Sequence, residues 1–157
     1  MTITSNPTIV VGIDGSPASL IALRWALSEA VATKAEVDVV HCSQPQNLRD
    51  VAFGSNHELH NGSMIMLDNE VAAALRDLPN PPTVSKTSVS GRPTTVLAER
   101  ARGARLLVLG AHGHTVLRDV VFGQVEAFSR KHADCPVVVV GLDGQSTRYE
   151  PAHSSIG

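Results

Sequence analysis

The chain alternates short apolar runs with longer stretches in which apolar residues recur at helical spacing. The runs of Val, Ile and Leu predict five strands at 8–13, 36–42, 83–90, 105–109 and 136–140. The helical spacing predicts four helices at 17–31, 63–78, 94–102 and 123–132. Alternating strands and helices joined by right-handed crossovers predict an α/β fold with an open, doubly wound parallel five-stranded sheet. The third run is the most polar, so we expect it at or near a sheet edge.

The first two helices have recognisable boundaries and faces. Ser16 is expected to cap the first helix, and Pro17 suits its first position because the proline ring already has a helical φ angle. The apolar spacing also places Val31 and Ile65 on the buried faces of the first and second helices.

Two segments lack the alternating pattern. Residues 44–62 are rich in Asn, Gly, Pro and His and predict a long mobile loop. Residues 143–157 are small and polar and predict a disordered tail. The folded domain is therefore expected to span residues 1–142.

Composition narrows the classes of function. The length of 157 residues indicates one domain. With 43% hydrophobic and only 3% aromatic residues, its core must be aliphatic, which favours a parallel sheet covered by helices. The net charge of −2, without a basic block, argues against nucleic-acid binding. The first residues do not resemble a signal peptide, and no apolar stretch approaches the ~20 residues that span a bilayer. With two cysteines far apart, we expect a cytoplasmic protein with reduced thiols and no membrane contact.

Glycines and one carboxylate follow the first and fourth predicted strands. Asp14 ends the first strand, and Gly110, Gly113 and Gly123 follow the fourth with two and nine residues between them. Glycine lets a ligand approach the main chain, and helix N-termini attract anions. Because ligands of doubly wound sheets bind at the carboxyl ends of strands, this pattern predicts a nucleotide site. The alternatives are a tight turn without a ligand and, for Asp14, a turn-and-capping role.

Other reactive side chains do not form a recognisable centre. The histidines at 57, 60, 112 and 114 lack the spacing of a closed zinc site, so no metal site is expected. We expect Cys42 to be a small buried side chain rather than a reactive thiol. Arg100 is expected at a solvated helix end. No catalytic grouping of serine, histidine and aspartate and no pair of carboxylates emerges, so we expect a protein that is not an enzyme, with slow ATP hydrolysis left open.

Ordered landmarks across residues 8–141 resemble the universal stress protein family. They are Val-Gly-Ile-Asp-Gly-Ser at 11–16, Val-Val-His-Cys at 39–42, Gly-Arg-Pro at 91–93, the glycine triplet, and Cys-Pro-Val-Val-Val-Val at 135–140. The resemblance implies a flavodoxin-like fold with strand order 3-2-1-4-5. It also implies a cytoplasmic regulatory module of the stress response that binds ATP or another adenine nucleotide, with Mg²⁺ accompanying ATP.

The resemblance also implies which residues form the site. Those that would hold the nucleoside are Gly12, Ile13, Asp14 and Cys42. Those that would hold the ribose and phosphates are Leu109, Gly110, His112, Gly113, Gly123, Gln124 and Val125.

Gln124 departs from the family pattern, which has Ser or Thr at this position. Its amide can donate to a phosphate oxygen, but the side chain is long enough to fill the phosphate space. This departure keeps two alternatives open. One is a binder of cyclic AMP, which has a single phosphate, and the other is a family member that binds no nucleotide and acts through protein contacts.

The last predicted strand bears on assembly. In the strand order that the resemblance implies, Val137–Val140 lies at the sheet edge, where an exposed apolar strand pairs readily with another chain. We therefore expect a homodimer built on this strand, as the resemblance also implies. The alternative is coverage of the edge by the tail beyond Asp143, which would leave a monomer.

Overall fold

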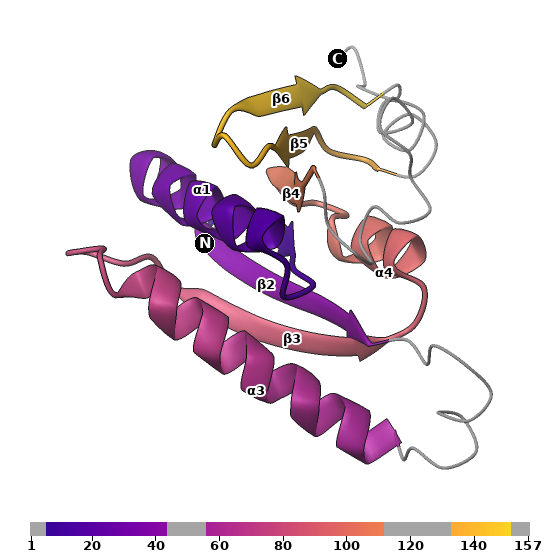
Figure 1. The fold of residues 1–157 in the computed structure, drawn as a ribbon. Helices are drawn as coiled ribbons and strands as arrows, with labels where there is room; N and C mark the ends of the chain where they lie inside the picture. Colours follow the sequence, from indigo (N-terminus) through magenta and orange to yellow (C-terminus); the bar gives the residue numbers. More distant parts are fainter. Residues whose placement is uncertain (1–5, 44–55, 112–132, 152–157) are drawn as a thin grey trace, which may run out of the picture.

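The computed structural model describes residues 6–43, 56–111 and 133–151 of the chain. Strands and helices follow one another along these residues (Figure 1). The elements are β1 (Thr8–Gly12), α1 (Pro17–Thr33), β2 (Glu36–Ser43), α3 (Asn56–Leu75), β3 (Val84–Ser90), α4 (Pro93–Arg100), β4 (Leu106–Gly110), β5 (Val137–Val140) and β6 (Ser146–Tyr149).

The strands form one six-stranded sheet in the order β3-β2-β1-β4-β5-β6. The first five strands of this order pair in parallel, and β6 pairs antiparallel with β5. The predicted order 3-2-1-4-5 is therefore confirmed, and so is the place of the polar strand β3 at an edge. The sixth strand was not expected.

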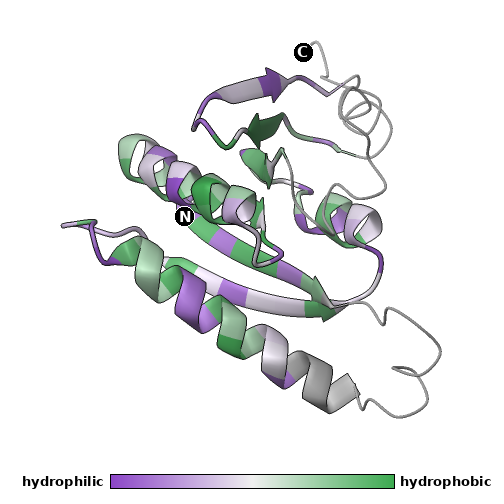
Figure 2. Ribbon diagram, viewed as in Figure 1, coloured by the Kyte–Doolittle hydropathy of each residue, from purple (hydrophilic) through white to green (hydrophobic). Residues whose placement is uncertain are grey.

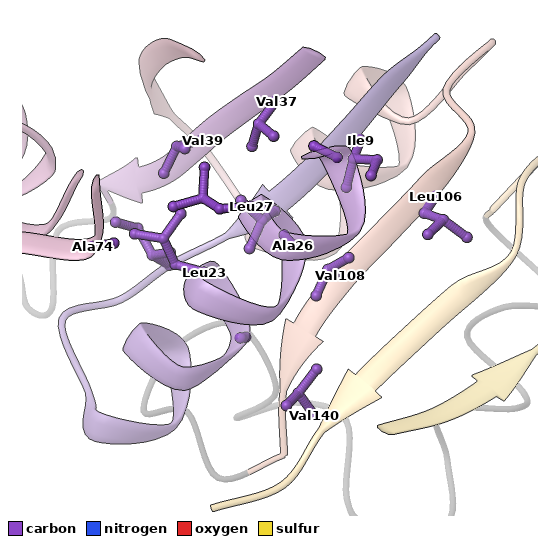
Figure 3. Packing of buried hydrophobic residues seen from close by; sticks show 14 of the residues in the cluster. Ile9, Leu23, Ala26, Leu27, Val37, Val39, Ala74, Leu106, Val108 and Val140 are labelled. Carbon is purple, nitrogen blue, oxygen red and sulfur yellow. The ribbon is translucent and has the colours of Figure 1, made fainter. Parts of the chain in front are cut away.

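Helices cover both faces of the sheet, with α1 and α3 on one face and α4 on the other. Under α1, Leu23 and Leu27 pack against Ile9, Val39 and Val108 from three neighbouring strands (Figure 3). Alternate residues of the same strands face α4, so the central strands are buried on both sides. This double burial explains why β1 and β4 are continuous apolar runs in the sequence.

The predicted boundary of α1 is confirmed. The Ser16 hydroxyl accepts a hydrogen bond from the Ser19 backbone N–H at 3.2 Å, and Pro17 occupies the first turn. The helix ends at Lys34, which has a left-handed φ of 57° and donates its N–H to the Ala30 carbonyl. This bond satisfies one of the carbonyls that every helix leaves open at its end.

Three expectations about the helices are wrong. Residues 56–62 belong to α3 rather than to a loop. Ile65 is 62% exposed because it lies two positions from the buried Leu67, on the opposite side of the helix. Val31 is 44% exposed because it lies in the last turn of α1, beyond the buried stripe that ends at Ala30.

The expected disordered tail is corrected for residues 146–149, which form β6. An Asp143-Gly144 turn reverses the chain: the Gly141 N–H donates to the Gln145 carbonyl at 2.9 Å, and Gly144 has a φ of 82°. The outer edge of Val137–Val140 is therefore paired within the chain. This corrects the expectation that the edge lies open to a second copy, and it matches the alternative of coverage by the segment beyond Asp143.

Candidate functional site

The carboxyl ends of β1 and β4 lie side by side at the point where the strand order reverses. The two strands are parallel neighbours, with Val11 opposite Val108. A Cβ added to Gly110 would lie 2.8 Å from the backbone C and O atoms of Ala18, so glycine is needed for α1 to begin this close to β4. In doubly wound sheets this is the position at which ligands bind.

The Asp14 turn joins β1 to α1 and is held by its own polar atoms. The Asp14 carboxylate accepts from the Ser16 N–H at 2.9 Å, and the Asp14 N–H donates to the Ser19 hydroxyl at 3.3 Å. Gly15 has a φ of 82°, a conformation that glycine adopts without strain. Ile13 is buried in the core and donates its N–H to the Val40 carbonyl, which ties the turn to β2. The turn role of Asp14 is confirmed, the helix cap is Ser16, and the binding role of Asp14 stays a prediction.

The N-terminus of α1 satisfies several of its own donors. The Ser19 N–H donates to the Ser16 hydroxyl, the Leu20 N–H donates to the Ser16 carbonyl, and Pro17 has no N–H. An anion at this helix terminus would have to displace the serine cap. We therefore do not place a phosphate on the first turn of α1.

A partly buried polar cluster lies next to this turn, between β2, β3 and α3. The Ser88 hydroxyl donates to the Ser63 hydroxyl at 2.7 Å, and Ser63 in turn makes a short hydrogen bond with Nδ1 of His41. Either tautomer of His41 satisfies this bond, since a hydroxyl can both donate and accept. The cluster thus attaches α3 to the carboxyl ends of two strands.

Burial lowers the pKa of His41 below its usual value of 6.5, and the negative charge of Asp14 partly opposes that shift. His41 is therefore neutral at pH 7, with Asp14 close enough for its charge to act on the ring. Sequence reasoning missed this cluster. The only signal was the pair of polar residues, His41 and Ser88, at matched positions of neighbouring strands.

The cluster and the Asp14 turn bring a serine, a histidine and an aspartate into one region. The serine is not exposed to solvent, as a serine nucleophile must be. Ser63 is 4% exposed, and its hydroxyl is engaged by both Ser88 and His41. A substrate carbonyl could not reach it without moving α3. The arrangement therefore suits a structural role better than nucleophilic catalysis.

Three further predicted site residues lie on the face of the sheet that α4 covers: Gly12, Cys42 and Leu109. Cys42 is buried beside Leu109, and burial raises the pKa of its thiol to about 11. A Cβ on Gly12 would lie 3.0 Å from Leu97 of α4 and 3.3 Å from Leu109. The interpretation of Cys42 as a small buried side chain is confirmed, since a protonated, enclosed thiol is unreactive. These residues can offer a ligand their backbone atoms at the strand ends.

The remaining predicted site residues lie outside the described part of the chain. They are His112, Gly113, Gly123, Gln124 and Val125.

A second polar cluster, centred on the buried Asp38, lies on the α4 face. Asp38 accepts from the Arg100 guanidinium at 2.9 and 3.2 Å, and its other oxygen accepts from Ser85 at 3.1 Å and Thr87 at 2.8 Å. Arg100 is therefore an ion-pair partner rather than a solvated helix end, which corrects that expectation. The pair attaches α4 to the sheet in the amino-terminal half of β2, away from the strand ends.

Within residues 6–43, 56–111 and 133–151, no three His, Cys, Asp or Glu side chains come together in a way that could hold a metal ion. In the same residues, no helix is both long enough and apolar enough to cross a bilayer.

Comparison with known proteins agrees with this fold. A model of the universal stress protein family matches residues 6–141. The architecture is thus the flavodoxin-like α/β fold. The chain belongs to the universal stress protein family.

Individual relatives give the same result. Universal stress protein Rv2623 of Mycobacterium tuberculosis (strain ATCC 25618 / H37Rv) is 29% identical over 149 residues, and the match covers 87% of this chain and 48% of the relative. The chain therefore spans about half the length of the curated relatives it matches.

Two solved structures share the fold. A universal stress protein in complex with cAMP has a TM-score of 0.57 at 24% identity, covering 88% of this chain and 99% of that one. A universal stress protein family protein from Arabidopsis thaliana with AMP bound has a TM-score of 0.56 at 17% identity, covering 86% and 91%.

Proposed function

We propose that this chain is a cytoplasmic regulatory module of the stress response that binds an adenine nucleotide at the carboxyl ends of β1, β2 and β4. The observation that carries the proposal is the close approach of α1 to Gly110, which puts the Asp14 turn beside the end of β4 where the strand order reverses. The class of ligand is suggested by the relatives solved with cAMP and AMP.

In this proposal the described residues recognise the nucleoside. Asp14 is a hydrogen-bond acceptor fixed in direction by its bond to the Ser16 N–H, and a carboxylate has acceptor capacity for the hydroxyls of a ribose. The strand-end backbone at Cys42 and Leu109 is positioned by packing on the α4 face. The neutral imidazole of His41 adds no positive charge that would compete for Asp14.

The phosphates are assigned to the glycine-rich segment after β4, by resemblance to the family. Two features favour a ligand with one phosphate, such as AMP or cyclic AMP, over ATP with Mg²⁺. The N-cap of α1 already uses first-turn N–H groups, so it offers little to a phosphate chain. Gln124 stands where family members that bind ATP have a hydroxyl.

Calorimetry of the full chain with AMP, cyclic AMP, ATP with Mg²⁺ and adenosine tests this proposal, with GMP as the control for base recognition. Asp14→Asn is the matched variant because its amide oxygen still accepts from the Ser16 N–H while the charge is lost. We expect Asp14→Asn to weaken adenosine binding by about 1.5 kcal/mol, the cost of losing one charged hydrogen bond. Absence of heat with every adenine ligand at millimolar concentration would contradict the proposal and favour a family member that acts through protein contacts alone.

We assign no catalytic reaction to this site. Ser63, which hydrogen-bonds to His41, lies on the side of α3 that packs against the sheet and is 4% exposed. Release of phosphate from ATP by the wild-type chain, abolished by Asp14→Asn, would overturn this assignment.

A further inference from the structure

One methionine of α3 lies against the turn that carries Asp14. A Cβ added to Gly15 would lie 3.0 Å from the Sδ atom and 4.0 Å from the Cγ atom of Met66. Apart from the residues adjacent to Gly15, no other atom of the described residues lies within 4 Å of that position. The thioether of Met66 therefore closes the space beside Gly15, next in sequence to the carboxylate that we assign to ligand recognition.

The helix α3 is anchored on both sides of Met66. Three residues earlier, the buried Ser63 hydrogen-bonds to a histidine of β2 and a serine of β3. The residue that follows, Leu67, is fully buried in the core. Because both anchors join the helix to the sheet, Met66 cannot retreat from the turn by a movement of α3 without breaking them.

Met66 is only partly shielded from solvent. Its side chain packs against the core beneath α1 and α3 but is partly buried rather than enclosed. The nearby Ile65 and Asp68 are exposed, and hydrophilic residues interrupt the hydrophobic ones along this helix (Figure 2). This partial exposure leaves the thioether open to a small oxidant in solution.

A thioether reacts with hydrogen peroxide by accepting one oxygen atom. The sulfur lone pair attacks one peroxide oxygen, so that a sulfur–oxygen bond forms and the oxygen–oxygen bond breaks. The departing hydroxide takes the proton of the transferred oxygen and leaves as water. The sulfur is thereby oxidised by two electrons and the peroxide is reduced by two. The product, methionine sulfoxide, is polar, and sulfoxide reductases return it to the thioether.

We propose that Met66 is an oxidation site at which a peroxide controls ligand binding by the Asp14 turn, an inference that rests on the function proposed above. In the reduced chain the thioether packs against Gly15 and supports the turn. An added oxygen has no room between Met66 and Gly15, so either the turn or the side chain moves and the contact is lost. Asp14 then leaves the direction that its bond to the Ser16 N–H sets, and nucleoside binding weakens.

Two methionines of α3 supply matched variants. Met64 and Met66 are both partly buried and pack against the same core, but only Met66 reaches the Cβ position of Gly15. Met66→Leu keeps an apolar side chain without an oxidisable sulfur, and Met64→Leu does the same at the control position. Met66→Gln introduces a polar side chain without any oxidant. Cys42 and Cys135 are present in every variant, so an effect of cysteine oxidation would appear in all of them.

Treatment of the full chain with hydrogen peroxide, followed by calorimetry with adenosine, tests the proposal. Peptide fragmentation in a mass spectrometer shows whether the added oxygen lies on residue 64 or 66. We expect oxidation to raise the Kd for adenosine about tenfold in the wild type and in Met64→Leu, the effect of losing about one charged hydrogen bond. Met66→Leu should keep its affinity after treatment. Untreated Met66→Gln should bind as weakly as the oxidised wild type, and sulfoxide reductases should restore the oxidised wild type.

The backbone amide shifts of residues 14–16, recorded without ligand, separate this proposal from the proposed function. Oxidation should change these shifts in the wild type and leave them unchanged in Met66→Leu. Shifts that change as expected in a chain that binds no adenosine would uphold the coupling of Met66 to the turn and contradict the proposed function.

Three results would overturn the proposal. An equal loss of affinity in treated Met66→Leu would place the effect of peroxide at another residue. Oxidation confirmed at Met66, with affinity and amide shifts unchanged, would mean that the thioether does not support the turn. General unfolding of the oxidised chain, measured by circular dichroism, would mean that Met66 stabilises the core rather than the turn.

Discussion

Polar side chains attach a helix to each face of the sheet, and their chemistry differs between the two faces. On the α3 face, a neutral chain of hydrogen bonds links Ser88, Ser63 and His41. On the α4 face, a charged pair links Asp38 to Arg100. Both join a helix to β2 and β3, but the neutral cluster lies at the carboxyl ends of the strands and the charged pair lies near their amino-terminal half.

The difference between the neutral cluster and the charged pair shows where this fold can tolerate a fixed charge. A buried ion pair must be fully compensated, and Asp38 is, with acceptor bonds on both oxygens. Beside the Asp14 turn, a permanent cation would bind the carboxylate that we assign to ligand recognition. A neutral histidine places no permanent cation beside that carboxylate while still attaching α3 to the sheet through Ser63.

The largest effect is expected from breaking the charged pair. Arg100→Met leaves the carboxylate of Asp38, whose side chain is 10% exposed, without its cation. Because Arg100 itself is 42% exposed, we expect a loss of about 3 kcal/mol, the low end for breaking a buried pair. Urea unfolding monitored by circular dichroism measures it.

Arg102→Met is the matched control for this experiment. Arg102 is 76% exposed and lies 4.0 Å from Asp134, so its loss should change the free energy of unfolding by less than about 0.5 kcal/mol. Equal effects of the two substitutions would show that the Asp38 pair does not stabilise α4 on the sheet.

Breaking the neutral cluster should cost less. Ser63→Ala removes the hydroxyl that links Ser88 to His41. It leaves His41 Nδ1 and the Ser88 hydroxyl without this partner. We expect a loss of about 1–2 kcal/mol in the free energy of unfolding. Ser28→Ala, at an exposed position of α1, provides the control and should be close to neutral. A neutral Ser63→Ala would mean that the cluster contributes packing only.

The neutral cluster should also make stability depend on pH. Because the folded-state pKa of His41 lies below 6.5, the unfolded chain binds more protons as the pH falls through that value. The stability contributed by neutral His41 is therefore present above pH 6.5 and is lost as the pH falls through the folded-state pKa. Free energies of unfolding at pH 7.5 and 5.5 should show a larger loss for the wild type than for His41→Gln. A loss of the same size in both proteins would contradict the assignment.

The smallest effect is expected from the phosphate end of the site. Gln124→Ser should tighten ATP more than adenosine, by at most about 1.5 kcal/mol, because a small hydroxyl replaces a long side chain near the phosphates. Calorimetry with both ligands compares them directly, and an equal change for ATP and adenosine would rule out this role for Gln124.

Sequence reasoning succeeded where one physical signal dominated. Strands buried on both faces are mostly apolar, so β1, β4 and β5 could be recognised from their continuous runs of Val, Ile and Leu. β2 could be recognised from its valines, although it also carries Asp38 and His41. Ser16 and Pro17 marked the start of α1 through local chemistry alone. The order of the strands followed from the family resemblance and from the handedness of the connections.

It failed where partners distant in the sequence decide the outcome. β6 is four polar residues long and exists because the edge of β5 is available to it, and the Asp143-Gly144 turn was its only local signal. The roles of Arg100 and Ser63 depend on partners 62 and 22–25 residues away. Asp14 follows β1 as predicted, and its carboxylate accepts from the Ser16 N–H to form the turn.

The central claim is that a nucleotide binds at the strand ends beside the neutral cluster and not at the charged one. Chemical-shift mapping of backbone amides during titration with AMP tests it most directly. We expect the largest shifts at residues 14–16, at His41 and at Gly110, with weaker shifts overall in Asp14→Asn. The amides of the charged cluster, Asp38, Thr87 and Arg100, should not shift. Shifts centred on α4, or none at millimolar AMP, would contradict it.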